Sequence, residues 1–162
     1  MHFSRRTLLG AGGAGLLGGL FLFGGRGSHA REGRFEIALS DEQWKKRLDP
    51  QQYAVLRRES TERAGSSPLN KEKRTGTYVC AGCNLPLFAS ATKFESGTGW
   101  PSFWQPIANA VGTREDNTLF FKRTEVHCRR CGGHLGHVFD DGPRPTGLRY
   151  CMNGAAMKFR PA

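Results

Sequence analysis

Hydrophobic positions recur at helical spacing only in the N-terminal half of the chain. Ser40 is followed three residues later by Gln43, which is the capping-box arrangement at the start of a helix. Trp44 and Leu48 are four residues apart and therefore share one face of that helix. The pattern predicts a short amphipathic helix that begins after Ser40.

A second short helix is expected directly afterwards. Asp49 is a favourable N-cap residue, and Pro50 suits the first helical position because its missing N–H is not needed there. The helix then runs over residues 51–58, where Tyr53 and Leu56 provide its buried side.

From residue 77 onward the pattern changes to short runs of β-branched and aromatic residues separated by Gly and Pro. No helical period intervenes between these runs, which favours antiparallel pairing. We therefore expect a mainly β fold, with antiparallel sheets forming an irregular barrel or sandwich behind the short N-terminal helices. The expected strands are Thr77–Cys80, Thr118–Lys122, Glu125–Cys128, His134–Phe139, Leu148–Asn153 and Ala156–Phe159.

The first 30 residues have a different character. Arg5-Arg6 precedes an uncharged, glycine-rich stretch over residues 8–23, and small residues flank His29 at positions 28 and 30. This order resembles a twin-arginine export signal with a signal-peptidase site after Ala30. We therefore expect export to the periplasm or another extracytoplasmic compartment, with a retained anchor as the alternative. Residues 31–162 then form one domain.

Composition and charge narrow the class of protein. A hydrophobic fraction of 38% is too high for a disordered chain. No uninterrupted apolar run reaches the roughly 20 residues of a spanning helix, which excludes a polytopic membrane protein. The net charge of +10 permits binding to nucleic acid or anionic lipid. It does not indicate such binding, because no basic run is longer than Lys45-Lys46-Arg47.

Four of the five cysteines form two C-x-x-C pairs, Cys80 with Cys83 and Cys128 with Cys131. Each pair bends into a knuckle whose sulfurs point at one centre, and two knuckles supply the tetrahedral sulfur shell that Zn²⁺ prefers. Such a closed shell has a structural role, since it has no open coordination position. Two disulfides or a thioredoxin-type redox pair are the alternatives.

Cys151 is the fifth cysteine, and its surroundings favour reactivity. Side chains alternate along a strand, so Arg149, Cys151 and Asn153 face one way while Tyr150 and Met152 face the other. The guanidinium on this face stabilises a thiolate, and Asn153 is placed to bind a substrate or to order the site. A buried, inert cysteine is the alternative.

Two further segments carry candidate chemistry. His134 and His137 can donate a proton to a leaving oxygen near neutral pH, or can be metal ligands in a mixed site. The aromatic and glycine-rich run over residues 94–104 is either a core-packing loop or a pocket wall. In the second case Trp100 offers a flat apolar face to a methyl-bearing group.

Taken in order, four stretches resemble the B-type methionine sulfoxide reductases, which act on the R epimer of methionine sulfoxide. The stretches are Tyr78–Cys83, Ser96–Phe103, Cys131–Pro143 and Leu148–Asn153. The resemblance covers residues 36–160 and implies antiparallel sheets around a zinc clamp, with a shallow site on one face.

The resemblance also implies roles for individual residues. The Cys151 thiolate would attack the sulfoxide sulfur, a histidine would protonate the oxygen, and Cys151 would become a sulfenic acid. Trp100 would hold the methyl group of the substrate. The residues implied to surround the nucleophile are His134, His137, Asp141, Arg149 and Asn153.

Two positions depart from the family pattern. Thr98 stands where many members carry a second, resolving cysteine, so we expect a single-cysteine cycle completed by an external thiol. That thiol would come from a thioredoxin-like protein or a membrane-fed relay, and the substrates would be oxidised methionines of exported proteins or peptides. Gly154 stands where serine is common, a difference expected to matter little.

A zinc-ribbon module that binds nucleic acid through its basic surface is the runner-up interpretation. It accounts for the cysteine pairs and the charge, but not for the export signal or the setting of Cys151. A peroxide-sensing thiol protein without turnover is a third option. We expect the enzyme, with no nucleic-acid partner and no stable membrane insertion after cleavage of the signal.

Overall fold

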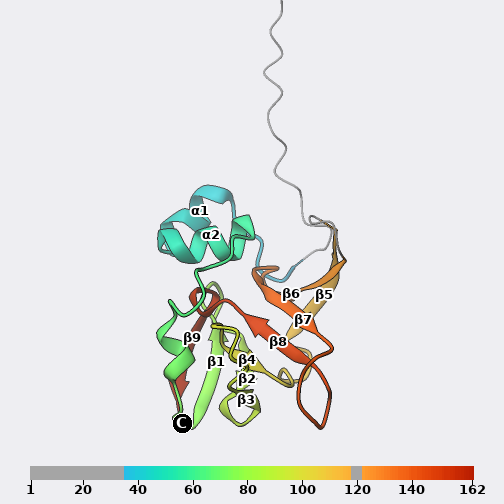
Figure 1. Cartoon of the computed structure of the whole chain (residues 1–162). Helices are drawn as coiled ribbons and strands as arrows, with labels where there is room; N and C mark the ends of the chain where they lie inside the picture. Colours follow the sequence, from blue (N-terminus) through green and yellow to red (C-terminus); the bar gives the residue numbers. More distant parts are fainter. Residues whose placement is uncertain (1–34, 118–121) are drawn as a thin grey trace, which may run out of the picture. The chain divides into compact units, whose positions relative to one another are not determined.

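The computed structural model describes residues 35–117 and 122–162. Within them, nine strands form two antiparallel sheets, a three-stranded sheet β2-β1-β9 and a six-stranded sheet β3-β4-β8-β7-β6-β5 (Figure 1). The strands are β1 Gly76–Cys80, β2 Pro86–Ala89, β3 Lys93–Phe94, β4 Ser102–Phe103, β5 Val111–Asp116, β6 Arg123–Cys128, β7 His134–Phe139, β8 Arg149–Met152 and β9 Met157–Pro161. The mainly β, antiparallel fold is confirmed, but the described strands do not close into a barrel.

Two α-helices precede the first strand, α1 (Asp41–Arg47) and α2 (Pro50–Arg58). Ser40 and Asp49 are their N-caps, and each forms a complete capping box with the glutamine three residues later. Both predicted helix starts are therefore confirmed. Three short 3-10 helices complete the fold: η1 Pro68–Lys71, η2 Ser90–Thr92 and η3 Gly154–Ala156.

The helices pack on the loops that carry the paired cysteines. Trp44 of α1 and Leu56 of α2 are almost completely buried. A Cβ atom on Gly82 would lie 3.4 Å from the Trp44 ring, and one on Gly133 would lie 2.8 Å from Leu56. Glycine at position 133 therefore permits the close approach of its loop to α2, whereas a side chain at position 82 would make an ordinary van der Waals contact with Trp44.

Aromatic side chains join the two sheets. Phe88 of β2 stacks on Phe103 of β4 with ring centroids 4.4 Å apart, and Tyr78 of β1 meets the same ring edge-on at 4.9 Å. All three side chains are fully buried. The core therefore lies between the sheets and leaves the opposite face of the six-stranded sheet for other groups.

Five predicted strands correspond to β1, β6, β7, β8 and β9 with shifts of at most two residues at their ends. The sixth, Thr118–Lys122, lies outside the described residues except for Lys122, which is not in a strand. The prediction missed β2, β5 and the two-residue strands β3 and β4. In the described ranges, no helix has the length and apolar character needed to cross a bilayer.

Candidate active site

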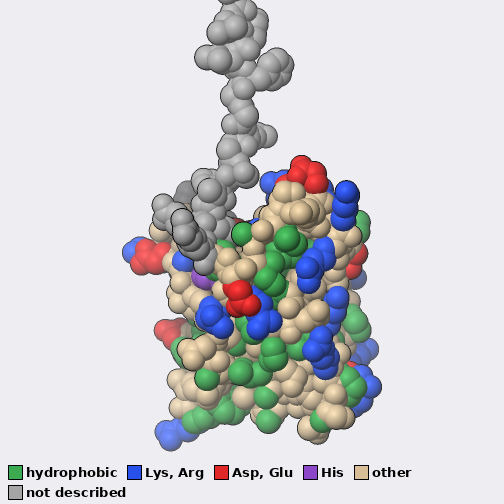
Figure 2. All heavy atoms as spheres, turned by 180° about the vertical axis from the view of Figure 1, so that it is seen from behind, with side chains coloured by type: hydrophobic (Ala, Val, Ile, Leu, Met, Phe, Trp, Pro, Cys, Tyr) green, Lys and Arg blue, Asp and Glu red, His purple; other side chains and the backbone are tan. Residues whose placement is uncertain are grey.

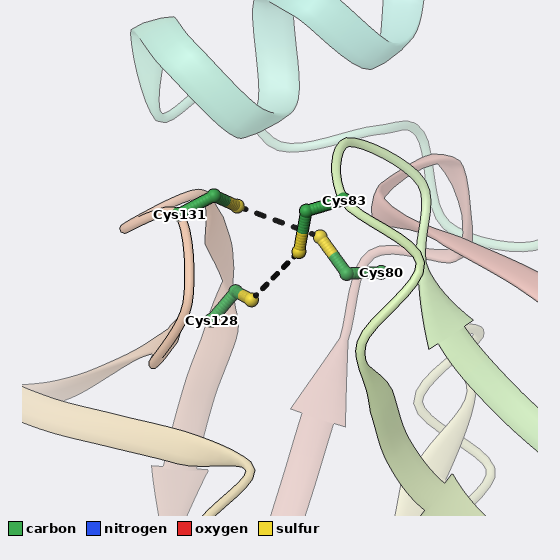
Figure 3. Close-up of side chains that lie close together, drawn as sticks. All are labelled: Cys80, Cys83, Cys128 and Cys131. Carbon is green, nitrogen blue, oxygen red and sulfur yellow. Dashed lines mark hydrogen bonds between the residues drawn. The ribbon is translucent and has the colours of Figure 1, made fainter. Parts of the chain in front are cut away.

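Four cysteines from the two sheets meet in one cluster. Cys80 ends β1 and Cys128 ends β6, while Cys83 and Cys131 lie in the turns that follow. The four Sγ atoms lie within 4.8 Å of one another, and all four residues are buried. Figure 3 shows the two pairs approaching from separate loops with their sulfurs directed at a common centre. The cluster therefore ties the three-stranded sheet to the six-stranded sheet.

The two cysteine loops, at Cys80–Cys83 and at Cys128–Cys131, have the same backbone hydrogen bond and the same closing conformation. The N–H of Asn84 donates to the carbonyl of Cys80, and the N–H of Gly132 donates to that of Cys128, both at 2.8 Å. Asn84 and Gly132 have φ values of 59° and 64°, in the left-handed region that Asn and Gly adopt most readily. Each knuckle thus closes on a residue suited to the turn.

Sulfur spacing tests what the cluster can hold. The Sγ atoms of Cys80 and Cys131 are 3.7 Å apart, and those of Cys83 and Cys128 are 3.5 Å apart. Tetrahedral zinc, with Zn–S bonds of about 2.3 Å, separates its sulfur ligands by about 3.8 Å. A disulfide requires about 2.05 Å. The four side chains could hold a metal ion, and they are not arranged as two disulfides.

One face of the six-stranded sheet is lined with ionisable side chains. His137 on β7 pairs with Cys151 on β8 and with Glu125 on β6. Two residues along β6, Arg123 pairs with Asp116 on β5. Directly paired residues lie on the same face of a sheet, so these five side chains share one face, which we call the polar face. The opposite face carries Val126, Val138, Tyr150 and Met152 and packs on the core.

Cys151 is half-buried in the polar face between β7 and β4. On the β4 side it pairs with Ser102, and its Sγ lies 3.7 Å from Oγ1 of Thr98. On the β7 side a Cβ atom on Gly136 would lie 2.1 Å from the carbonyl oxygen of Cys151. Glycine at position 136 therefore allows β7 to approach the strand of the candidate nucleophile.

Arg149 lies two residues before Cys151 on the same face of β8. It donates through two nitrogens to the two carboxylate oxygens of Asp141, each at 2.8 Å, and its guanidinium lies 4.4 Å from the Phe139 ring centroid. The carboxylate of Asp141 raises the pKa of Arg149, and Cys151 acts in the same direction. The guanidinium is thus fixed on the face of β8 that also carries Cys151.

His137 is held by an acid that the sequence did not reveal. Its Nε2 lies 2.7 Å from Oδ2 of Asp116, which also accepts from Arg123 at 2.6 Å. Burial lowers the pKa of His137 below its ordinary value, although the hydrogen bond with Asp116 opposes this shift. The ring is therefore neutral at pH 7, Nε2 donates to Asp116, and Nδ1 is left to exchange a proton.

His134 belongs to the same group of rings. Its ring centroid is 5.5 Å from that of His137, and its Nδ1 lies 2.8 Å from Oε1 of the buried Glu125. Burial would raise the pKa of Glu125, but hydrogen bonds from His127 and His134 hold it well below its usual range. The ionised carboxylate therefore accepts from Nδ1 and fixes the orientation of the His134 ring.

A β-bulge brings both histidines to the polar face. Along β6, Val126 pairs with Gly136 and the next residue, His127, pairs with His134, so Leu135 is an extra residue in β7. In a regular strand, residues three apart point to opposite faces. The extra residue therefore aligns His134 with His137.

The segment that carries Trp100 is joined to the strand of Cys151 by a backbone hydrogen bond. The carbonyl of Pro101 accepts from the N–H of Met152, the residue after Cys151, at 2.9 Å. The indole Nε1 of Trp100 donates to the carbonyl oxygen of Glu62 at 3.1 Å. One edge of the half-buried ring is therefore fixed, and its role as a pocket wall stays a prediction.

Asn153 is brought close to the site, but its amide is already engaged. Oδ1 accepts from the N–H of Glu62 at 3.0 Å, and Nδ2 donates to the carbonyl of Leu135 at 3.1 Å. The residue is only 3% exposed. Both expected roles of Asn153, binding the substrate and ordering the site, stay predictions, and Asp141 is connected to this face through Arg149.

Sequence reasoning singled out neither Asp116 nor Glu62. Asp116 is at the end of β5, a strand that was not predicted, and its partner His137 is 21 residues away. Glu62 lies in a loop, and the residue its carboxylate binds at closest range, Gly154, is 92 residues away. Local patterns carry no signal for such contacts, which only the pairing of distant strands reveals.

Comparison with known proteins shows which family the chain belongs to. Residues 48–161 match the SelR domain family model. The chain is 55% identical over 127 residues to the peptide methionine sulfoxide reductase MsrB of Leptospira interrogans, covering 78% of this chain and 97% of that protein. The MsrB of Methanosarcina mazei is 55% identical over 125 residues, which cover 76% of this chain and 89% of that protein. This chain therefore belongs to the SelR domain family.

Proposed function

We propose that this protein reduces the R epimer of methionine sulfoxide in peptides and proteins, with Cys151 as the nucleophile. The observation that carries the proposal is the pairing of Cys151 with His137 on a face that also holds Arg149. Family membership agrees with the resemblance seen in the sequence, and the zinc-ribbon binding module is not favoured. On the face shown in Figure 2, basic side chains are scattered among other types.

The first half of the reaction transfers oxygen to Cys151. The thiolate, stabilised by Arg149, attacks the sulfoxide sulfur while Trp100 contacts the methyl group. The sulfur–sulfur bond formed in this attack breaks again as the oxygen passes to Cys151, so that the S–O bond of the substrate is lost and an S–O bond to Cys151 is gained. Methionine leaves with two electrons, and Cys151 becomes a sulfenic acid.

His137 moves the proton that this step requires. Because its ring is neutral at pH 7, Nδ1 accepts the proton of the Cys151 thiol and then donates it toward the sulfoxide oxygen. Asp116 stabilises the transient imidazolium through the bond to Nε2. The arrangement of thiol, imidazole and carboxylate resembles other activated nucleophiles, in which a third group orients the base.

The second half of the cycle uses an external thiol. Thr98, and not a cysteine, contacts Cys151, and the other four cysteines are buried in the cluster. An external thiol attacks the sulfenic acid, releases water and forms a mixed disulfide. A second thiol then restores Cys151 and leaves as a disulfide with the first.

The cluster of Cys80, Cys83, Cys128 and Cys131 binds one Zn²⁺ with a structural role. The sulfur spacing fits a tetrahedral ion, and four thiolates complete its coordination. When bound, the ion supplies cross-linking of the two sheets. No step of the reaction passes through it.

We further propose export by the twin-arginine route, so that the substrates are oxidised methionines of exported proteins. The support is the arrangement around Arg5-Arg6, together with the start of the family match at residue 48, beyond the proposed signal. Replacing Arg5 and Arg6 by lysine should keep the protein in the cytoplasm. Unchanged export of this variant would count against the route.

The decisive experiment is a dithiothreitol-driven assay on the separated R and S epimers of a blocked methionine sulfoxide. The zinc-loaded protein is compared with Cys151→Ser. We expect turnover of the R epimer alone, reduced by at least about a thousandfold in the variant. Absence of turnover by the folded protein would overturn the proposal.

A further inference from the structure

Glu62 is a buried acid in the loop between α2 and η1, and only 6% of its surface is exposed. Its Oε1 accepts from the N–H of Gly154 at 2.7 Å, and its Oε2 accepts from the N–H of Ala155 at 2.9 Å. These two residues begin η3, the turn that follows the strand of Cys151. The carboxylate thus fixes the loop to the segment just beyond the nucleophile.

The backbone of Glu62 makes two further hydrogen bonds. Its N–H donates to Oδ1 of Asn153 at 3.0 Å, and its carbonyl accepts from the indole of Trp100 at 3.1 Å. One residue therefore contacts both segments that flank Cys151. The two hydrogen bonds to the Glu62 carboxylate are the shortest of the four, so the side chain is the closest of these connections.

Gly65 of the same loop and Asn70 of η1 reinforce the contact with the Trp100 segment. The N–H of Gly65 donates to the carbonyl of Gly99 at 2.8 Å, and Nδ2 of Asn70 donates to the same oxygen at 2.9 Å. Gly99 has a φ of 93°, and a Cβ atom there would lie 2.9 Å from Ala64. The loop and the segment before Trp100 therefore fit closely.

We infer that Glu62 is a positioning residue for substrate recognition: its carboxylate holds the loop so that the loop backbone orients Trp100 and Asn153 around Cys151. This inference rests on the proposed function, because it assigns Trp100 to the methyl group of the sulfoxide. Glu62 touches neither the nucleophile nor its proton donor among its hydrogen bonds. Its loss should therefore impair substrate binding more than thiol reactivity.

The test compares the wild-type protein with Glu62→Ala and Glu62→Gln. Val55→Ala is the stability control, because Val55 is an apolar residue buried in α2 and takes part in none of the hydrogen bonds described for Glu62. For Glu62→Ala we expect kcat/KM for the R sulfoxide to fall about ten- to hundredfold, mainly through KM. Alkylation of Cys151 by iodoacetamide, corrected with Cys151→Ser, should stay near the wild-type rate.

A spectroscopic readout is independent of turnover. In protein labelled with ¹⁵N-tryptophan, the indole resonance of Trp100 should move in Glu62→Ala, while those of Trp44 and Trp104 keep their positions. Glu62→Gln retains one oxygen acceptor and should show the same changes at smaller size. If Glu62→Ala does not fold, Glu62→Gln carries the test.

Three results would overturn the inference. The first is a folded variant with unchanged KM and an unchanged Trp100 resonance. The second is alkylation of Cys151 in Glu62→Ala that slows as much as kcat/KM falls. The third is a KM change in Val55→Ala equal to that in Glu62→Ala. Either result would indicate a general loosening of the fold. A wild-type protein without turnover would overturn the proposed function instead, and the indole resonance would still decide whether Glu62 holds Trp100.

Discussion

The cysteine cluster and the surroundings of Cys151 place sulfur atoms in two different ways. In the cluster, four buried thiols converge on one another, and the spacing within each C-x-x-C pair already fixes half of the geometry. Around Cys151, spacing along β8 places Arg149, but the neighbours on β4 and β7 come from distant segments of the chain. The cysteine cluster holds the two sheets together, whereas the surroundings of Cys151 keep their geometry only while the sheets stay in place.

The site around Cys151 depends on the cysteine cluster, but the cluster does not depend on the site. The cluster joins the end of β1 to the end of β6, and β6 carries Glu125 and Arg123 of the polar face. Disturbing the cluster should therefore disturb the site, while changes at the site should leave the cluster intact. The following substitutions test that asymmetry.

The largest effect is expected for Cys128→Ser. Three sulfurs cannot complete the tetrahedral shell, so zinc content should fall from about one ion per chain to near zero. The free energy of unfolding should fall by about 4 kcal/mol or more, because the ion is bound only by the folded chain. Metal analysis and thermal unfolding measure both changes. Cys151→Ser is the matched control, and full zinc content with unchanged stability in Cys128→Ser would contradict the expected role.

Asp116→Asn should lower kcat/KM about ten- to hundredfold with zinc content unchanged. The carboxylate raises the pKa of His137, so its removal lowers that pKa further. Activity that requires neutral His137 rises as pH increases through this pKa, so the acidic limb of the pH profile should move to lower pH. Glu115→Gln is the control, since Glu115 is exposed and pairs with Lys122. A limb that moves to higher pH would refute the assignment.

Gly154→Ser should destabilise the fold by about 1–3 kcal/mol. A Cβ atom at this position would lie 1.9 Å from Oγ and 2.5 Å from Cβ of Ser67. The expectation that serine here matters little overlooked this contact. Ser67→Gly added to the variant should restore much of the stability, as chemical denaturation would show. Equal losses in the single and double variants would mean that Ser67 is not the cause.

The smallest effect on rate is expected for Thr98→Cys. Its side chain would replace an oxygen that lies 3.7 Å from Sγ of Cys151, so a disulfide can form after the first half-reaction. Turnover with dithiothreitol should change within about threefold, while mass spectrometry of the oxidised variant detects a new intramolecular disulfide. Wild-type protein and Thr98→Ser should show sulfenic acid or a mixed disulfide. An intramolecular disulfide to Cys151 in the wild type would contradict the single-cysteine cycle.

Local signals explain what the sequence could predict. The capping residues Ser40 and Asp49 act on their own helices, and the C-x-x-C pairs act within their own turns. The alternation around Cys151 correctly separated Arg149 from Tyr150, because one face of β8 is buried. These features can be predicted from a few neighbouring residues, without knowing how the rest of the chain folds.

The missed features depend on pairing between distant segments. β5 has no buried residue, and β2 is four residues long and begins with proline, so neither shows a strong strand pattern. Asp116 becomes recognisable only once β5 lies beside β6. Glu62 is recognisable only once its loop meets η3.

The additional residue in β7 has a consequence for insertions and deletions. Side chains alternate between the two faces of a strand, and the extra residue Leu135 shifts this alternation between His134 and His137. Deletion of a single residue there would restore regular alternation. One of the two imidazoles would then point toward the hydrophobic interior, although no catalytic residue had been replaced. Length at this point of the chain is thus as much a part of the chemistry as composition.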